Sequence, residues 1–173
     1  MKKKFIPVNE PLIGKEEKKY LISCISKNQI SSSGIYVKEF EKKFAKKVRR
    51  KYAVSVSNGT AAIQLAFESL NLKKGDEVIV PSFTIISCIL PIIRLGARPV
   101  LVDCDPRTWN MDVEKTINLI TKKTKAIILV NIYGLCVDMD KILKICKNKK
   151  IKILEDSAES LGLKYKGRPC GSF

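Results

Sequence analysis

The 173-residue chain contains no histidine. This absence excludes any catalytic apparatus within the chain that needs an imidazole, such as a Ser-His-Asp triad or an H-E-x-x-H zinc site. Neither G-x-G-x-x-G nor G-x-x-x-x-G-K-[ST] occurs, so nicotinamide and P-loop interpretations lose their main support. The most apolar run, Ile85–Ile93, contains Pro91 and is too short to span a bilayer.

Acidic residues are few compared with basic ones. The chain has 33 Lys and Arg against 17 Asp and Glu, a formal net charge of +16. The basic runs are Lys2–Lys4, Lys15–Lys19, Lys42–Lys51, Lys73–Lys74, Lys122–Lys125 and Lys141–Lys152. Because nucleic-acid binding favours one focused stripe, we interpret these scattered runs as solvated faces and expect no nucleic-acid partner. Such a surface can still attract anionic substrates, for example nucleotide sugars.

Cysteine pairs are also missing. None of the six cysteines forms a C-x-x-C motif, and several lie in apolar runs, which favours a reduced compartment. The N-terminal Met1–Lys4 resembles the start of a signal peptide, but Pro7 and Pro11 interrupt the stretch after it, so no hydrophobic signal segment exists. We therefore expect a cytoplasmic protein that does not enter a membrane.

The apolar spacing predicts an α/β protein. Helices are expected at Lys15–Lys27, Tyr36–Val48, Thr60–Leu72, Phe83–Leu95, from a cap at Asp112 to Thr121, and from a cap at Asp138 to Lys147. Strands are expected at Tyr52–Ser57, Glu77–Val80, Pro99–Val102, Lys125–Val130 and Ile151–Leu154, with a hairpin over Lys164–Pro169. Strands that alternate with helices predict a mostly parallel sheet with helices on both faces.

Two elements could hold a ligand. In Ser57–Ala62 a strand, a glycine turn and a helix follow one another, so the amides of Gly59, Thr60 and Ala61 could bind an anion; many such turns carry these residues merely as caps. Asp156 follows the strand Ile151–Leu154, at the edge where open α/β sheets bind ligands. It could pair with a protonated pyridine nitrogen, or equally cap a helix or turn. Glu155 is interpreted as structural.

Motifs along almost the whole chain carry a family resemblance. They are Ile6–Pro11, Ser31–Gly34, Val56–Ala62, Gly75–Thr84, Gly96–Val100, Thr124–Ile128, Tyr133–Gly134, Asp138–Asp140, Glu155–Glu159 and Tyr165–Arg168. In this order the chain resembles the N-terminal half of the DegT/DnrJ/EryC1/StrS sugar aminotransferases, which are pyridoxal 5′-phosphate (PLP) enzymes of fold type I. Asp105–Asn110 and Glu159 are similar to the perosamine-synthetase-like branch.

The resemblance implies roles for single residues. Gly59, Thr60 and Ala61 match the turn that holds the cofactor phosphate, and Asp156 matches the partner of the pyridine nitrogen. Glu159 falls where relatives place Gln, His or Glu beside the cofactor, although it could be an ordinary exposed glutamate. Ile85 falls at the ring-stacking position, where many relatives have an aromatic residue.

The resemblance also implies that the chain is incomplete. No catalytic residue is assigned within it, because the Schiff-base lysine of relatives would lie beyond Phe173, as would the last strands and the C-terminal small domain. Residues 1–50 would form an N-terminal helical segment and residues 51–173 a partial large domain. The absent strands would insert between Tyr52–Ser57 and Ile151–Leu154, so we expect the phosphate turn to lose its fixed distance from Asp156.

The function implied is transfer of an amino group, from glutamate, to a keto group of a nucleotide-linked deoxysugar such as a GDP- or dTDP-4-keto-6-deoxyhexose. The intact enzyme is expected to be a homodimer. The alternative is a non-catalytic relic, or one half of a split protein that acts as a binding or assembly partner.

Overall fold

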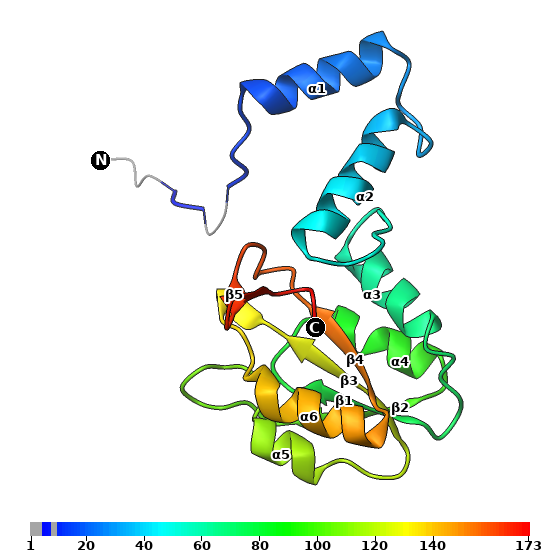
Figure 1. Ribbon diagram of the computed structural model, residues 1–173, viewed down its shortest axis with the longest axis vertical. Coiled ribbons are helices and arrows are strands. Elements are labelled where there is room, and N and C mark those ends of the chain that lie inside the picture. Colours follow the sequence, from blue (N-terminus) through cyan, green and yellow to red (C-terminus); the bar gives the residue numbers. More distant parts are fainter. Residues whose placement is uncertain (1–4, 8–9) are drawn as a thin grey trace.

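A computed structural model describes residues 5–7 and 10–173. The run Lys2–Lys4 and the Val8–Asn9 part of the N-terminal motif lie outside the described residues. Figure 1 shows a sheet with helices on either side, from which the first two helices extend away. The chain passes through α1 (Lys15–Ser26), α2 (Ile35–Lys47), α3 (Gly59–Glu68), β1 (Glu77–Pro81), η1 (Ile86–Cys88), α4 (Leu90–Arg94), β2 (Arg98–Val102), α5 (Val113–Asn118), β3 (Thr124–Val130), η2 (Ile132–Gly134), α6 (Met139–Lys149), β4 (Lys152–Asp156), β5 (Lys164–Tyr165) and β6 (Arg168–Pro169).

The sheet has four parallel strands in the order β2-β1-β3-β4. The β3–β4 register pairs Val130 with Asp156, so the predicted ligand aspartate lies beside the carboxyl end of β3. Strand β4 forms one edge of this sheet. The hairpin β5–β6 is also present, as predicted.

Side chains that alternate along the strands separate two cores. Val78, Val80 and Ile128 pack with residues of α3, η1 and α4 on one face. Ile79 and Ile127 point to the other face and pack with residues of α5 and α6. Since successive strand side chains point to opposite faces, a strand buried on both sides reads as a continuous apolar run. The predicted parallel sheet with helices on both faces is confirmed.

Polar caps begin the helices where the sequence placed them. The Asp112 carboxylate accepts from the Lys115 amide over 3.0 Å at the start of α5, and Asp138 accepts from the Asp140 amide over 3.3 Å at the start of α6. Each cap satisfies an amide that the first helical turn leaves unpaired.

The predicted strand Tyr52–Ser57 is wrong. This segment has no strand partner, and Tyr52 and Val54 are 75% and 69% exposed. The apolar alternation is real, but a strand exists only where a neighbouring strand completes its hydrogen bonds, and none of the described strands lies beside it.

The predicted helix Phe83–Leu95 is also wrong in part. The chain stays irregular to Ile85, makes the single turn η1 and enters α4 with Pro91 in its first turn. Proline has no amide hydrogen and clashes with the preceding turn, which prevents one continuous helix. Helix α3 ends at Glu68, before the predicted Leu72, and Asn71 has a left-handed backbone (φ 52°).

Helix α1 buries none of its residues. It contacts α2 through the Ser23 and Tyr36 hydroxyls, which are 2.9 Å apart, and through an edge-on pair of Tyr20 and Tyr36 rings. Within the described part of the chain, no helix combines the length and apolarity needed to cross a membrane. The boundary at residue 50 stays a prediction.

Candidate functional site

A small pocket opens at the carboxyl ends of β3 and β4, where open α/β sheets bind ligands. Its walls come from the segment after β1, the ends of β3 and β4, and the loop after β4. The lining residues are Thr84, Ile85, Val130, Asn131, Ile132, Asp156, Ala158 and Glu159.

Asp156 is half-buried in this wall and is held from two sides. One carboxylate oxygen accepts from the Ala158 amide over 3.1 Å, and the other accepts from the Cys88 thiol over 3.5 Å. Burial raises the pKa of the Cys88 thiol to about 12, so it keeps its proton and acts as a donor. The carboxylate still has acceptor capacity toward the pocket.

The turn before α3 offers a second polar element. The Asn58 side chain accepts from the Ala61 amide over 2.9 Å, so that amide is already used by the helix cap. The amides of Gly59 and Thr60 have no acceptor among the described residues, and a Cβ at Gly59 would meet open space. The free donors at this helix end are therefore Gly59 and Thr60. The Thr60 hydroxyl lies 2.8 Å from that of Ser87.

Ile85 and Glu159 both line this pocket. Ile85 is 52% exposed, which leaves an aliphatic surface available for contact. Glu159 is exposed, and its carboxylate accepts from the Tyr133 amide. Tyr133 has a left-handed backbone (φ 49°), and Gly134 (φ 74°) packs so closely that an added Cβ would lie 3.3 Å from the Glu159 carbonyl oxygen. This turn is thus fixed against the loop that follows β4.

Sequence reasoning missed two buried asparagines that shape the same edge. Asn131 donates to Glu155 and accepts from the Val137 amide, and Asn110 accepts from the Ile132 amide. The signal for Asn131 was present in the sequence, since it follows a buried strand as Asp156 does. Asn110 ends the Asp105–Asn110 motif, but the irregular stretch around it gave no sign that its side chain reaches the Ile132 amide.

Glu155 has the structural role that the sequence suggested. Its carboxylate accepts from the Asn131 side chain, the Ser157 hydroxyl and the amides of Gly171 and Phe173. It therefore ties the last residues of the chain to the end of β4.

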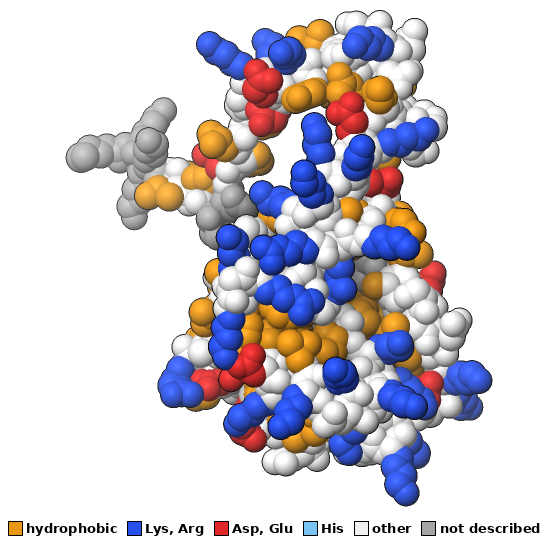
Figure 2. All heavy atoms as spheres, in the orientation of Figure 1, with side chains coloured by type: hydrophobic (Ala, Val, Ile, Leu, Met, Phe, Trp, Pro, Cys, Tyr) orange, Lys and Arg blue, Asp and Glu red, His pale blue; other side chains and the backbone are white. Residues whose placement is uncertain are grey.

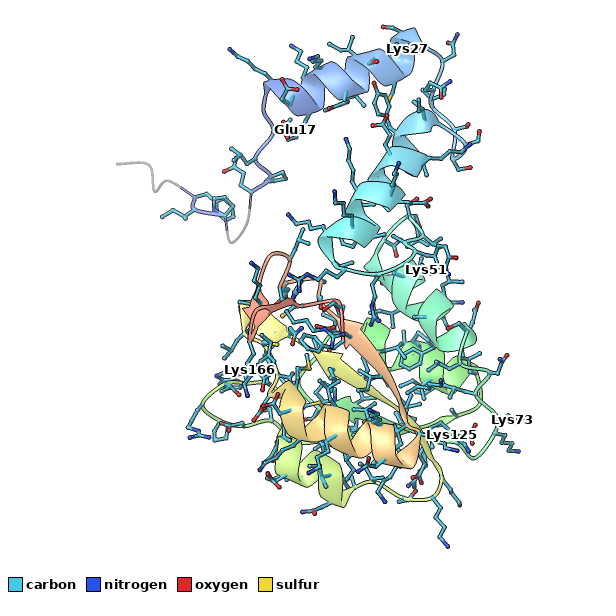
Figure 3. The ribbon with its side chains drawn as sticks, in the orientation of Figure 1. Glu17, Lys27, Lys51, Lys73, Lys125 and Lys166 are labelled. Atoms are coloured by element: carbon cyan, nitrogen blue, oxygen red, sulfur yellow. The ribbon has the colours of Figure 1, made fainter. Side chains whose placement is uncertain are left out.

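Basic side chains are spread over the molecule. Figure 2 shows Lys and Arg scattered over most of the visible face, and in Figure 3 Lys27, Lys51 and Lys166 lie far apart, while Lys73 and Lys125 lie close together beside Asp76. Lys166, for example, pairs with Asp140, while Lys125 lies 4.0 Å from Asp76. This distribution agrees with the interpretation of solvated faces.

The pocket holds the Asp156 carboxylate, and the turn before α3, which does not line that pocket, offers two free amides. A carboxylate and a helix start of this kind suit a cofactor that carries a basic ring and a phosphate. The profile of the DegT/DnrJ/EryC1/StrS aminotransferase family matches residues 11–173. The chain therefore belongs to this family, as its motifs predicted, and the family consists of enzymes.

Named relatives agree with this assignment. GDP-perosamine synthase of Escherichia coli O157:H7 is 44% identical over 170 residues, which are 98% of the chain and 47% of that protein. The dTDP-3-amino-3,6-dideoxy-alpha-D-galactopyranose transaminase of Aneurinibacillus thermoaerophilus is 43% identical over 151 residues, 84% of the chain and 42% of that protein. The chain spans less than half the length of these curated relatives.

A solved structure confirms the fold class. The crystal structure of GDP-4-keto-6-deoxymannose-3-dehydratase with a trapped PLP-glutamate geminal diamine superposes with a TM-score of 0.92 at 36% identity, over 96% of the chain and 45% of that protein. The fold is thus that of the fold-type-I PLP aminotransferases, and PLP is the cofactor that these comparisons indicate.

The residues present fit PLP. The free amides of Gly59 and Thr60 suit a phosphate, and the Asp156 carboxylate in the pocket wall suits a protonated pyridine nitrogen.

Proposed function

We propose that the chain is the N-terminal part of a sugar aminotransferase that acts on a nucleotide-linked keto-deoxysugar. The single observation that carries the proposal is the carboxylate of Asp156, held by the Ala158 amide and the Cys88 thiol in the wall of a pocket at the sheet edge. When bound there, PLP would supply an electron sink for moving an amino group between donor and acceptor.

Each predicted site residue then has a stated task. Gly59 and Thr60 donate to the cofactor phosphate, and Ala61 contributes by completing the cap that orients this turn. Asp156 keeps the pyridine nitrogen protonated by accepting its hydrogen bond. Ile85 covers the ring by dispersion contact, and Glu159, anchored by Tyr133, borders the space where a sugar would enter.

The substrates are inferred from the named relatives. We infer a GDP- or dTDP-linked keto-deoxysugar as the amino acceptor, because relatives named for GDP- and dTDP-linked amino sugars match this chain. A 4-keto-6-deoxyhexose is the example that the family resemblance implies. Glutamate is proposed as the amino donor, since the similar dehydratase structure traps it with PLP. We also propose a homodimer in the cytoplasm.

The lysine that binds the cofactor would come from a segment that follows Phe173. We therefore expect no transamination by the 173-residue chain alone. An exposed apolar segment at Tyr52–Val56 and the edge position of β4 favour completion by further strands. The same two features would also serve the alternative, a split-protein half that acts as an assembly partner.

The first test is to sequence the source locus past codon 173. The chain is then produced together with any downstream segment that the same reading frame, or a neighbouring one, encodes. Conversion of glutamate to 2-oxoglutarate with a GDP-4-keto-6-deoxyhexose, lost in Asp156→Asn, is the expected result. The Asn variant keeps the shape and the bond from Ala158 but lacks the negative charge. Turnover by the isolated chain, or full activity of the variant, would contradict the proposal.

A further inference from the structure

The single turn η1 contacts both ends of the candidate site. Ser87 places its hydroxyl 2.8 Å from that of Thr60, at the start of α3. On the next residue, the Cys88 thiol donates to Asp156 over 3.5 Å. Two adjacent side chains therefore touch the phosphate-binding turn and the pyridine-binding carboxylate.

Cys88 is itself held in place. Its side chain is fully buried in the core that contains Phe67 and Ile92. The Thr84 hydroxyl donates to its sulfur over 3.3 Å, so the thiol both receives a hydrogen bond and passes one on to Asp156. Because close-packed interiors allow little movement, this chain of contacts fixes where η1 lies relative to β4.

None of the described strands leads directly into α3, so the sheet does not fix the position of its first turn. Tyr52–Val56 leads into it without a strand partner, so the sheet does not position the turn. The core packs α3 against η1 and α4 through residues such as Phe67 and Cys88. The sequence alone gives no sign of this route, because it predicts one continuous helix over the segment that contains Ser87 and Cys88.

We propose that Ser87 and Cys88 are positioning residues that set the spacing between the two ends of the cofactor site. The inference rests on the proposed function, which assigns the phosphate to Gly59 and Thr60 and the pyridine nitrogen to Asp156. A ligand that is bound at both ends gains affinity only when the distance between the two binding groups matches the length of the ligand.

Paired variants separate positioning from packing. Cys88→Ser keeps a donor but loses apolar bulk, whereas Cys88→Val fills the space without a donor. Likewise, Ser87→Thr keeps the hydroxyl that faces Thr60, and Ser87→Ala removes it. If Cys88 only fills the core, the Val variant resembles the unaltered chain and the Ser variant is the impaired one; positioning predicts the reverse.

The probe is pyridoxamine 5′-phosphate, which carries both the phosphate and the pyridine ring and needs no covalent lysine. Its fluorescence is titrated with the purified full chain and with each variant. We expect Cys88→Val and Ser87→Ala to weaken binding about fivefold each, the effect of one ordinary hydrogen bond. Cys88→Ser and Ser87→Thr should stay within about twofold. Inorganic phosphate, which occupies one end only, should compete equally well in the unaltered chain and in both Cys88 variants.

A second measurement needs no ligand. Thermal unfolding of Cys88→Val, Asp156→Ala and the double variant tests whether the two side chains are coupled. We expect the melting temperature of the double variant to fall by less than the sum of the two single decreases. Additive decreases would show that Cys88 and Asp156 are not coupled and would overturn the proposal. Equal pyridoxamine phosphate affinity of Cys88→Val and the unaltered chain would overturn it as well. Failure of the unaltered chain to bind the probe, with coupling intact, would leave the contact between Cys88 and Asp156 standing and count against the assignment of the phosphate to Gly59 and Thr60 in this chain.

Discussion

Asn131 offers the sharpest stability test, because it is 1% exposed and each of its polar atoms has a partner. Its amide group donates to the Glu155 carboxylate over 3.1 Å, and its oxygen accepts from the Val137 amide over 3.1 Å. Val137 is also 1% exposed, so water cannot replace the lost acceptor. The two bonds connect the end of β4 to the loop that follows β3.

The magnitude can be worked out from these two partners. Asn131→Ala leaves the buried Val137 amide without an acceptor, which costs about 1–3 kcal/mol, and removes a hydrogen bond to a charged group, worth about 1.5–3 kcal/mol. We therefore expect the free energy of unfolding to fall by about 2.5–6 kcal/mol, a large part of the ~5–15 kcal/mol typical of a domain. With an m-value of about 2 kcal/mol/M, the urea midpoint falls by about 1.2–3 M.

The pH dependence of Asn131→Asp tests the same reasoning from another side. The new carboxylate faces Glu155, and like charges raise its folded-state pKa above its unfolded value of about 3.9. The cost is fully present above the raised pKa and disappears as pH falls below the unfolded value, where both states are protonated. The free energy of unfolding of Asn131→Asp should therefore rise relative to that of Asn131→Ala as the pH becomes acid.

The control is Asn148→Ala, which removes an exposed asparagine from α6 and should change stability by less than about 0.5 kcal/mol. Urea unfolding of the variants at pH 7 and pH 4, followed by circular dichroism, provides the measurement. A loss below about 1 kcal/mol for Asn131→Ala would refute the argument, because one orphaned buried amide alone should cost that much.

Three further predictions rest on the contacts of Gly134, Glu77 and Asp138. Gly134→Ala should lower the melting temperature, because φ of 74° is strained for alanine and its Cβ would lie 3.3 Å from the Glu159 carbonyl oxygen; the cost is about 1–2 kcal/mol. Glu77 has a lowered pKa, chiefly through the hydrogen bond from the Thr121 hydroxyl, so its contribution is present above the unfolded pKa and is lost as pH falls through the folded one. Urea midpoints of Glu77→Gln should thus depend less on pH in that acid range. Asp138→Ala removes the cap of α6 and the acceptor of the Tyr165 hydroxyl, 2.6 Å away, and should cost about 2 kcal/mol, measured by urea unfolding.

Each of these has a contrary outcome. An unchanged melting temperature in Gly134→Ala would mean that the turn relaxes freely. Parallel pH profiles of Glu77→Gln and the unaltered chain would remove Glu77 from the acid transition. A neutral Asp138→Ala would show that other groups satisfy the start of α6.

Much of the fold could be predicted from local pattern. Apolar runs such as Ile127–Val130 mark strands buried on both faces, and Asp112 and Asp138 mark helix starts because their carboxylates satisfy amides close in sequence. The position of Asp156 at the carboxyl edge could also be predicted, because parallel strands end at the same side of a sheet.

Tertiary structure alone decided the rest. Tyr52–Ser57 has the pattern of a strand, but pairing depends on which neighbour is present, and no property of the segment itself reports that. The bonds from Cys88 to Asp156 and from Ser87 to Thr60 join residues 68 and 27 positions apart, and only the folded chain brings them together. The sequence by itself therefore determined the family, the four strands of the parallel sheet and the choice of candidate site residues, because each depends on local pattern. The contacts of Ser87 with Thr60 and of Cys88 with Asp156 came from long-range packing.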